Sequence, residues 1–255
     1  MTLAPQPQTI ANDVLKQLNA LKAAANHLTD FQSRKLKQEI KKLKDVDVSG
    51  MWLLLGMLAA LEGDEVEMRH CHDNAITNSN GKLEALLNYG VSLGMMGYFE
   101  EALVKFRTAY NNNQEDLVVV DALIDGCLNT GRFEEANLWV EEWKKLNPDS
   151  NHRLTYFISR VNNYINDNNL NEKNIIKILD TSISVLRENN IYASDVTLDI
   201  KDDEDSEWLS WLCQIKAPVE KRIKLSVDFA DKIARSNIDS SLFNKFVIRF
   251  ESKYS

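Results

Sequence analysis

A 34-residue period in the middle of the chain constrains the fold more than any other feature of the sequence. Gly63, Gly97 and Gly131 lie 34 residues apart, and they open the segments Gly-Asp-Glu-Val-Glu, Gly-Tyr-Phe-Glu-Glu and Gly-Arg-Phe-Glu-Glu. Glycine suits the left-handed residue that ends one helix, and glutamates suit the positive first turn of the next helix. Such a period is typical of stacked helix–turn–helix units, in which no single unit buries its apolar face alone.

Other residues recur in the same register. The corresponding residues of the first helices are Trp52, Leu55 and Gly56; Leu86, Tyr89 and Gly90; and Val120 and Leu123. Those of the second helices are Met68, Ala102 and Ala136, followed by His72, Phe106 and Val140. With Pro148 closing the third unit, this pattern resembles the tetratricopeptide repeat family over residues 49–150.

The resemblance implies a mainly α fold, a tetratricopeptide-type array of antiparallel helix pairs with units at 49–82, 83–116 and 117–150. Helical spacing of apolar residues predicts two helices over residues 1–48, the second beginning after Thr29 and Asp30, which form an N-terminal helical cap or a degenerate repeat. Two more helices are expected at 152–166 and 171–189. Residues 151–190 therefore form a degenerate fourth repeat or a set of capping helices.

The last part of the chain has a different pattern. Apolar residues alternate with polar ones in three short runs, which predicts strands around Val196–Ile200, Leu209–Ile215 and Phe246–Phe250. An amphipathic helix from Pro218 to about Arg235 separates the second and third runs. These elements predict a small α+β domain over residues 191–255, with about three strands covered on one face by helices. This domain resembles no family.

Charge and composition exclude several classes of protein. A net charge of −8 argues against a nucleic-acid-binding protein, which needs a basic surface. The polar N-terminus predicts no signal peptide, and the longest apolar run, Met51–Leu61, is too short for insertion into a membrane. Three cysteines without a Cys-x-x-Cys pair indicate no disulfide framework. We therefore expect a cytoplasmic protein.

The sequence shows few groups suited to catalysis or metal binding. His70 and His72 lie close in sequence, but consecutive helical residues point about 100° apart, so the two cannot share a metal without other ligands. The acidic turn at residues 202–205 lacks the pattern of a calcium loop. No phosphate-binding loop or nucleophile motif is present. We expect no metal, no cofactor and no enzymatic activity.

The resemblance also implies where a partner would bind, because in this family the first helices line a concave groove. The partner-facing places map to Leu53, Met57, Leu87, Val91, Asp121, Asp125 and Leu128. The lysines and asparagines of the carboxylate-clamp members are absent from the fifth and ninth places of each unit. The groove is thus expected to be apolar in two units and acidic in the third, which suits an extended segment with aliphatic and basic side chains.

These features imply an adaptor or chaperone that holds a segment of another protein, with a partial likeness to the chaperones of type III secretion translocators. Three alternatives stay open. The N-terminal helices or the C-terminal domain could fill the groove. The chain could be an enzyme or ligand-binding regulator with its site in the C-terminal domain. It could also be a structural subunit of a larger assembly.

Overall fold

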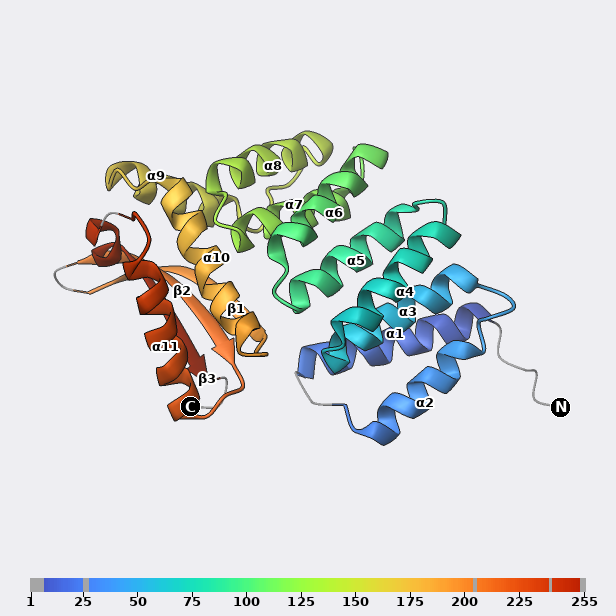
Figure 1. Cartoon of the computed structure of the whole chain (residues 1–255). Coiled ribbons are helices and arrows are strands. Elements are labelled where there is room, and N and C mark those ends of the chain that lie inside the picture. Colours follow the sequence, from blue (N-terminus) through green and yellow to red (C-terminus); the bar gives the residue numbers. More distant parts are fainter. Residues whose placement is uncertain (1–6, 25–27, 204–205, 239, 253–255) are drawn as a thin grey trace. The chain divides into compact units, whose positions relative to one another are not determined.

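The computed structural model describes residues 7–24, 28–203, 206–238 and 240–252, which are mainly α-helical and end in a small three-stranded sheet (Figure 1). This confirms the expected fold class. The chain divides into two compact units, Met1–Gln114 and Glu115–Ser255. The division lies between the second and third of the predicted repeats, and the domain boundaries expected near residues 48, 150 and 190 stay predictions.

The described part of the first unit contains six helices that follow one another in pairs. They are α1 (Pro7–Ala24), α2 (Asp30–Lys41), α3 (Val48–Glu62), α4 (Glu65–Asn78), α5 (Leu83–Met95) and α6 (Phe99–Asn112). The first helix of each pair packs on the next, so α3 lies between α1 and α5, and the second helices α2 and α4 also pack against α3 and α5. The unit therefore has a continuous row of first helices, α1–α3–α5.

The second unit continues with helices and then forms the sheet. Its elements are α7 (Leu117–Asn129), α8 (Phe133–Leu146), α9 (Thr155–Asp167), α10 (Glu172–Glu188), β1 (Ala193–Asp202), β2 (Glu207–Ile215), α11 (Val219–Ala234), a 3-10 helix (Ser240–Asn244) and β3 (Phe246–Ser252). The three strands and the helix α11 confirm the elements expected from the sequence. β2 is the central strand, antiparallel to β1 and parallel to β3. The parallel pair was not expected, and it requires the crossover that α11 supplies.

The turns inside the helix pairs repeat with the period of the sequence. The helices α4, α6 and α8 begin 34 residues apart, at Glu65, Phe99 and Phe133. The glycines before them have φ angles of 76°, 76° and 74°, which confirms the left-handed conformation expected at these positions. After each glycine the next N–H donates to a carbonyl five residues earlier, in the pairs Asp64–Ala59, Tyr98–Leu93 and Arg132–Cys127, at 3.0, 2.9 and 2.9 Å.

A ring of the second helix lies against a glycine of the first helix in two of the pairs. A Cβ atom on Gly56 would stand 2.7 Å from Cδ2 of His72, and one on Gly90 would stand 2.3 Å from Cε1 of Phe106. The third pair has Ile124 and Val140 at the corresponding places, and both are buried. The pairs thus use a large residue against glycine, or two aliphatic residues, to fill the same space.

One of the expected helix boundaries is wrong. The helix expected to begin at His152 begins at Thr155. The His152 side chain explains this difference, because its Nδ1 atom accepts a hydrogen bond from the Leu154 N–H at 3.2 Å and its Nε2 atom lies 2.7 Å from an Asp121 oxygen. These contacts hold the segment before α9 in a turn.

The close approach at Gly90 yields a first prediction. Gly90→Ala should destabilise the protein by about 1–3 kcal/mol, because the added methyl overlaps the Phe106 ring and this overpacking outweighs the helix propensity of alanine. In a Phe106→Val background the alanine should cost much less. Urea denaturation of the four proteins measures this coupling.

Gly94→Ala on the same helix is the matched control, because the nearest atom to its Cβ would be 3.9 Å away. This variant should be neutral or slightly more stable than the parent protein. An equal cost of Gly90→Ala with and without the Phe106 ring would contradict the proposed packing.

Candidate functional site

The four groove positions predicted in the first unit lie on two neighbouring helices. Leu53 and Met57 belong to α3, and Leu87 and Val91 occupy the same places one period later on α5. Each pair is separated by four residues, so its side chains share one side of a helix. Because α3 packs against α5, the structure brings these four positions into adjoining rows.

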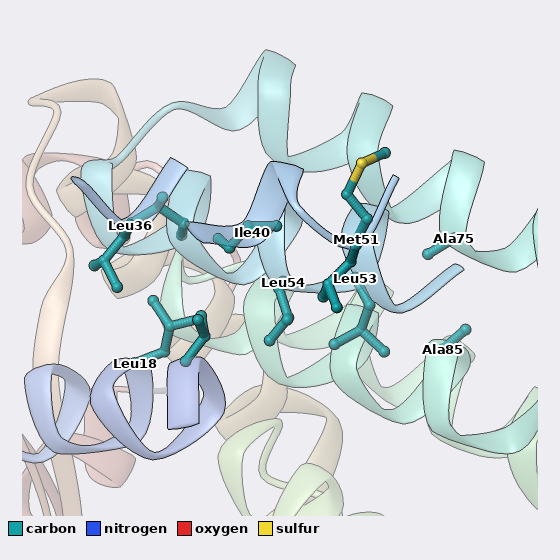
Figure 2. Close-up of a cluster of buried hydrophobic side chains, with 11 residues drawn as sticks. Leu18, Leu36, Ile40, Met51, Leu53, Leu54, Ala75 and Ala85 are labelled. Atoms are coloured by element: carbon teal, nitrogen blue, oxygen red, sulfur yellow. The ribbon is translucent and has the colours of Figure 1, made fainter. Parts of the chain in front are cut away.

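Leu53 is not open to a partner. Only 7% of its surface is exposed, and it belongs to a hydrophobic cluster with Val14 and Leu18 of α1. Figure 2 shows Leu54 between Leu18 and Leu53, with Leu53 on the side of Ala85 of α5. Leu53 is therefore taken up by the packing of the first unit, and the alternative that the N-terminal helices fill the groove stays a prediction.

Met57, Leu87 and Val91 are only half-buried. Met57 packs against the edge of the hydrophobic cluster, while Leu87 and Val91 follow each other along α5. We name these three residues the apolar face. It is the part of the predicted groove in the first unit that keeps accessible apolar surface.

The acidic groove positions on α7 already have partners within the second unit. Asp121 Oδ1 lies 2.7 Å from Nε2 of His152, and Arg153 donates to both carboxylate oxygens of Asp125 at 3.0 and 3.1 Å. Sequence reasoning missed these contacts because His152 and Arg153 follow the repeats and lie about one unit later in the chain. The last predicted residue, Leu128, is half-buried near the end of α7.

The Asp121–His152 and Asp125–Arg153 pairs differ in how deeply the basic partner is buried. The His152 side chain is 3% exposed and packs edge-on against Trp143, with ring centroids 5.3 Å apart, so its bond to Asp121 is part of the fold. The Arg153 side chain is 62% exposed. Burial raises the pKa of Asp125, and the nearby Arg153 charge opposes this shift. An exposed pair of this kind contributes about 0–1 kcal/mol, so a basic group of a partner could replace Arg153.

The histidines of α4 serve different purposes. His72 is fully buried, with Nε2 2.8 Å from the Ser92 hydroxyl and its ring stacked on Tyr89 at 4.9 Å. His70 is exposed, and its ring packs edge-on against Trp52. Within the described ranges, no group of three histidine, cysteine or acidic side chains is arranged to hold a metal ion. His72 is therefore a packing residue.

Burial of His72 predicts a loss of stability in acid. Burial, with a smaller effect from the Lys105 charge, lowers the pKa of His72 from 6.5 to about 4. The unfolded chain then takes up a proton first as the pH falls, so stability is intact above pH 6.5 and decreases down to about pH 4, by about 3 kcal/mol in total. His72→Phe, which imitates Phe106 in the next pair, should remove this component from urea midpoints measured across that range.

His70→Gln is the control for this measurement, because His70 is exposed on the same helix. It should leave the pH dependence unchanged. Identical pH dependence in the parent protein and the His72→Phe variant would show that His72 is not held neutral by the fold.

The first unit also contains an open pocket of about 530 Å³. Its lining residues are Leu28, Asp30, Ser33, Arg34, Lys37, Leu61, Glu62 and Asp64. Much of its charge is internally paired, because Ser33 and Lys37 both contact Glu62. Sequence reasoning did not find this pocket, since its walls come from α2 and from the α3–α4 turn. It offers no histidine or cysteine for catalysis.

Two of the three buried cysteines carry thiols of low reactivity. Burial raises the pKa of Cys71 and of Cys213 to about 12, so both stay protonated near neutral pH. In the part of the chain that the structure describes, no helix is long and apolar enough to cross a membrane. No protein-family model and no curated protein matches the chain.

Proposed function

We propose that this chain is a cytoplasmic adaptor or chaperone of the tetratricopeptide type, without enzymatic activity, which holds an extended segment of another protein. The observation that carries the proposal is the apolar face. Met57 and Val91 occupy corresponding places on the adjoining first helices α3 and α5, Leu87 lies one turn before Val91, and all three stay only half-buried.

The spacing of the apolar face suggests how such a segment would lie. Packed helices are about 8–10 Å apart, and an extended chain covers this distance in about three residues. A segment running across α3 and α5 would therefore place aliphatic side chains about three residues apart on the two helices. The protein would then recognise the partner by aliphatic side chains at fixed intervals along the partner's extended backbone.

The acidic positions contribute less to this proposal than the sequence suggested. The Asp121 carboxylate is already paired with His152, and the Asp125 carboxylate is already paired with Arg153. Of the two carboxylates, Asp125 is the better contact for a lysine or arginine of the partner, because its present ion pair is exposed. We therefore expect the partner's aliphatic side chains to dominate the affinity.

Site-specific photo-crosslinking in the native host tests the proposal. A photoreactive amino acid at position 87 of the full chain should give a discrete adduct with one partner. The same group at position 104 should not, because Val104 is exposed on a second helix, α6. Leu87→Glu should weaken binding of the crosslinked partner at least about tenfold, because it buries a charge in an apolar contact.

Val104→Glu is the matched control for this substitution and should bind the partner normally. Circular dichroism and a thermal unfolding curve should show that the Leu87→Glu variant is folded. Equal adduct formation at both positions, or normal binding by a folded Leu87→Glu variant, would contradict the proposed face.

A further inference from the structure

The helix α11 in the second unit carries an apolar stripe on its outer side. Val219, Ile223 and Val227 are 54%, 60% and 54% exposed, and Ala230 and Ala234 are exposed as well. Their spacings of four, four, three and four residues place all five side chains on one side of the helix. We name this set the α11 stripe.

The opposite side of α11 is occupied by the fold. Leu225 and Ile233 are buried, and the ring of Phe229 meets Phe250 of β3 edge-on, with centroids 6.1 Å apart. Lys221 donates to the Asn189 side chain at 2.7 Å, and Lys232 pairs with Glu188 of α10. The α11 stripe is therefore apolar surface that the packing of this unit does not need.

Exposed charges, Glu220, Lys224 and Asp231, lie along one border of the stripe. Lys224 and Asp231 are seven residues apart on this flank, and no side-chain hydrogen bond or ion pair of either is found among the described residues. This contrasts with Lys221 and Lys232 on the inner side, which both have partners. Because Lys224 and Asp231 lie on opposite sides of Val227 along the helix, an antiparallel second copy can bring each of them near the opposite charge.

An antiparallel pair of α11 helices satisfies both the shape and the charge. Placing Val227 opposite Ala230 of the second copy also places Ile223 opposite Ala234, so these two large side chains each meet a small one, and Val219 lies outside the overlap. The same register puts Lys224 beside Asp231 of the second copy, twice by symmetry. In a parallel pair, each residue of the central stripe would face the same residue of the second copy. Lys224, on the flank, would then lie beside Val219 of the second copy, which carries no opposite charge.

We propose that the α11 stripe is a self-association surface, through which two copies of this chain form an antiparallel, two-fold symmetric dimer. The contact is isologous and closes on itself, so it gives dimers and not fibres. A helix of 16 residues is about 24 Å long and buries a small area, so we expect a reversible dimer. This surface is separate from the apolar face of the first unit.

Sedimentation equilibrium of the full chain over a range of concentrations tests this proposal. The parent protein should show a monomer–dimer equilibrium, and Val227→Glu should be monomeric throughout. Val66→Glu is the matched control, because Val66 is 81% exposed on α4 in the other unit, and it should dimerise normally. All these positions are exposed, so the variants should stay folded.

Charge reversal tests the antiparallel register. Lys224→Glu and Asp231→Lys should each raise the dissociation constant about threefold or more, because each creates two like-charge contacts. The protein with both substitutions should recover the affinity of the parent. Failure of the double variant to recover would overturn the antiparallel pairing.

Two other outcomes would overturn the proposal as a whole. A parent protein that stays monomeric at every concentration would mean that a different protein, or another part of this chain, covers the stripe. A dimer that persists in Val227→Glu would mean that association occurs through another surface.

Discussion

The close approach of the two helices in a pair is the constraint on which the repeated part of the structure depends. His72 and Phe106 can lie directly over the first helix only because Gly56 and Gly90 lack side chains there. The left-handed glycines at the turns then return the chain at the required angle. Under both conditions, the apolar residues on the outside of one helix pair pack against those of the next pair. A single pair could not bury these residues alone.

In this packing, one side of each first helix contacts neighbouring helices, and the other side is available for contact with a partner. Leu53 is taken up by the hydrophobic cluster of the first unit. Of the predicted groove positions in this unit, Met57, Leu87 and Val91 keep accessible surface, and this residue set carries the proposed adaptor function. The second unit adds an apolar helix stripe of its own on α11. A chain with one face for a partner segment and another for a second copy would present two binding faces at once.

Local patterns in the sequence predicted the helices, the three strands and the turn glycines, because these depend on residues within one period. Contacts between distant residues could not be predicted in this way. The pairing of Asp121 with His152 and of Asp125 with Arg153 joins α7 to a segment beyond the repeats. The parallel register of β2 and β3 depends on the crossover through α11, which alternation of apolar residues does not encode. The burial of Leu53 in the hydrophobic cluster likewise depends on tertiary packing.

Residue-resolved amide hydrogen exchange of the free protein tests the repeated helix pair, on which the account rests, most directly. In each repeated turn the N–H after the left-handed glycine donates back into the preceding helix, at Asp64, Tyr98 and Arg132. The account predicts that these three amides exchange slowly and to a comparable extent, although they lie between helices. Exchange of all three at the rate of an unstructured peptide, beside protected helices, would contradict the turns and with them the repeated pairs.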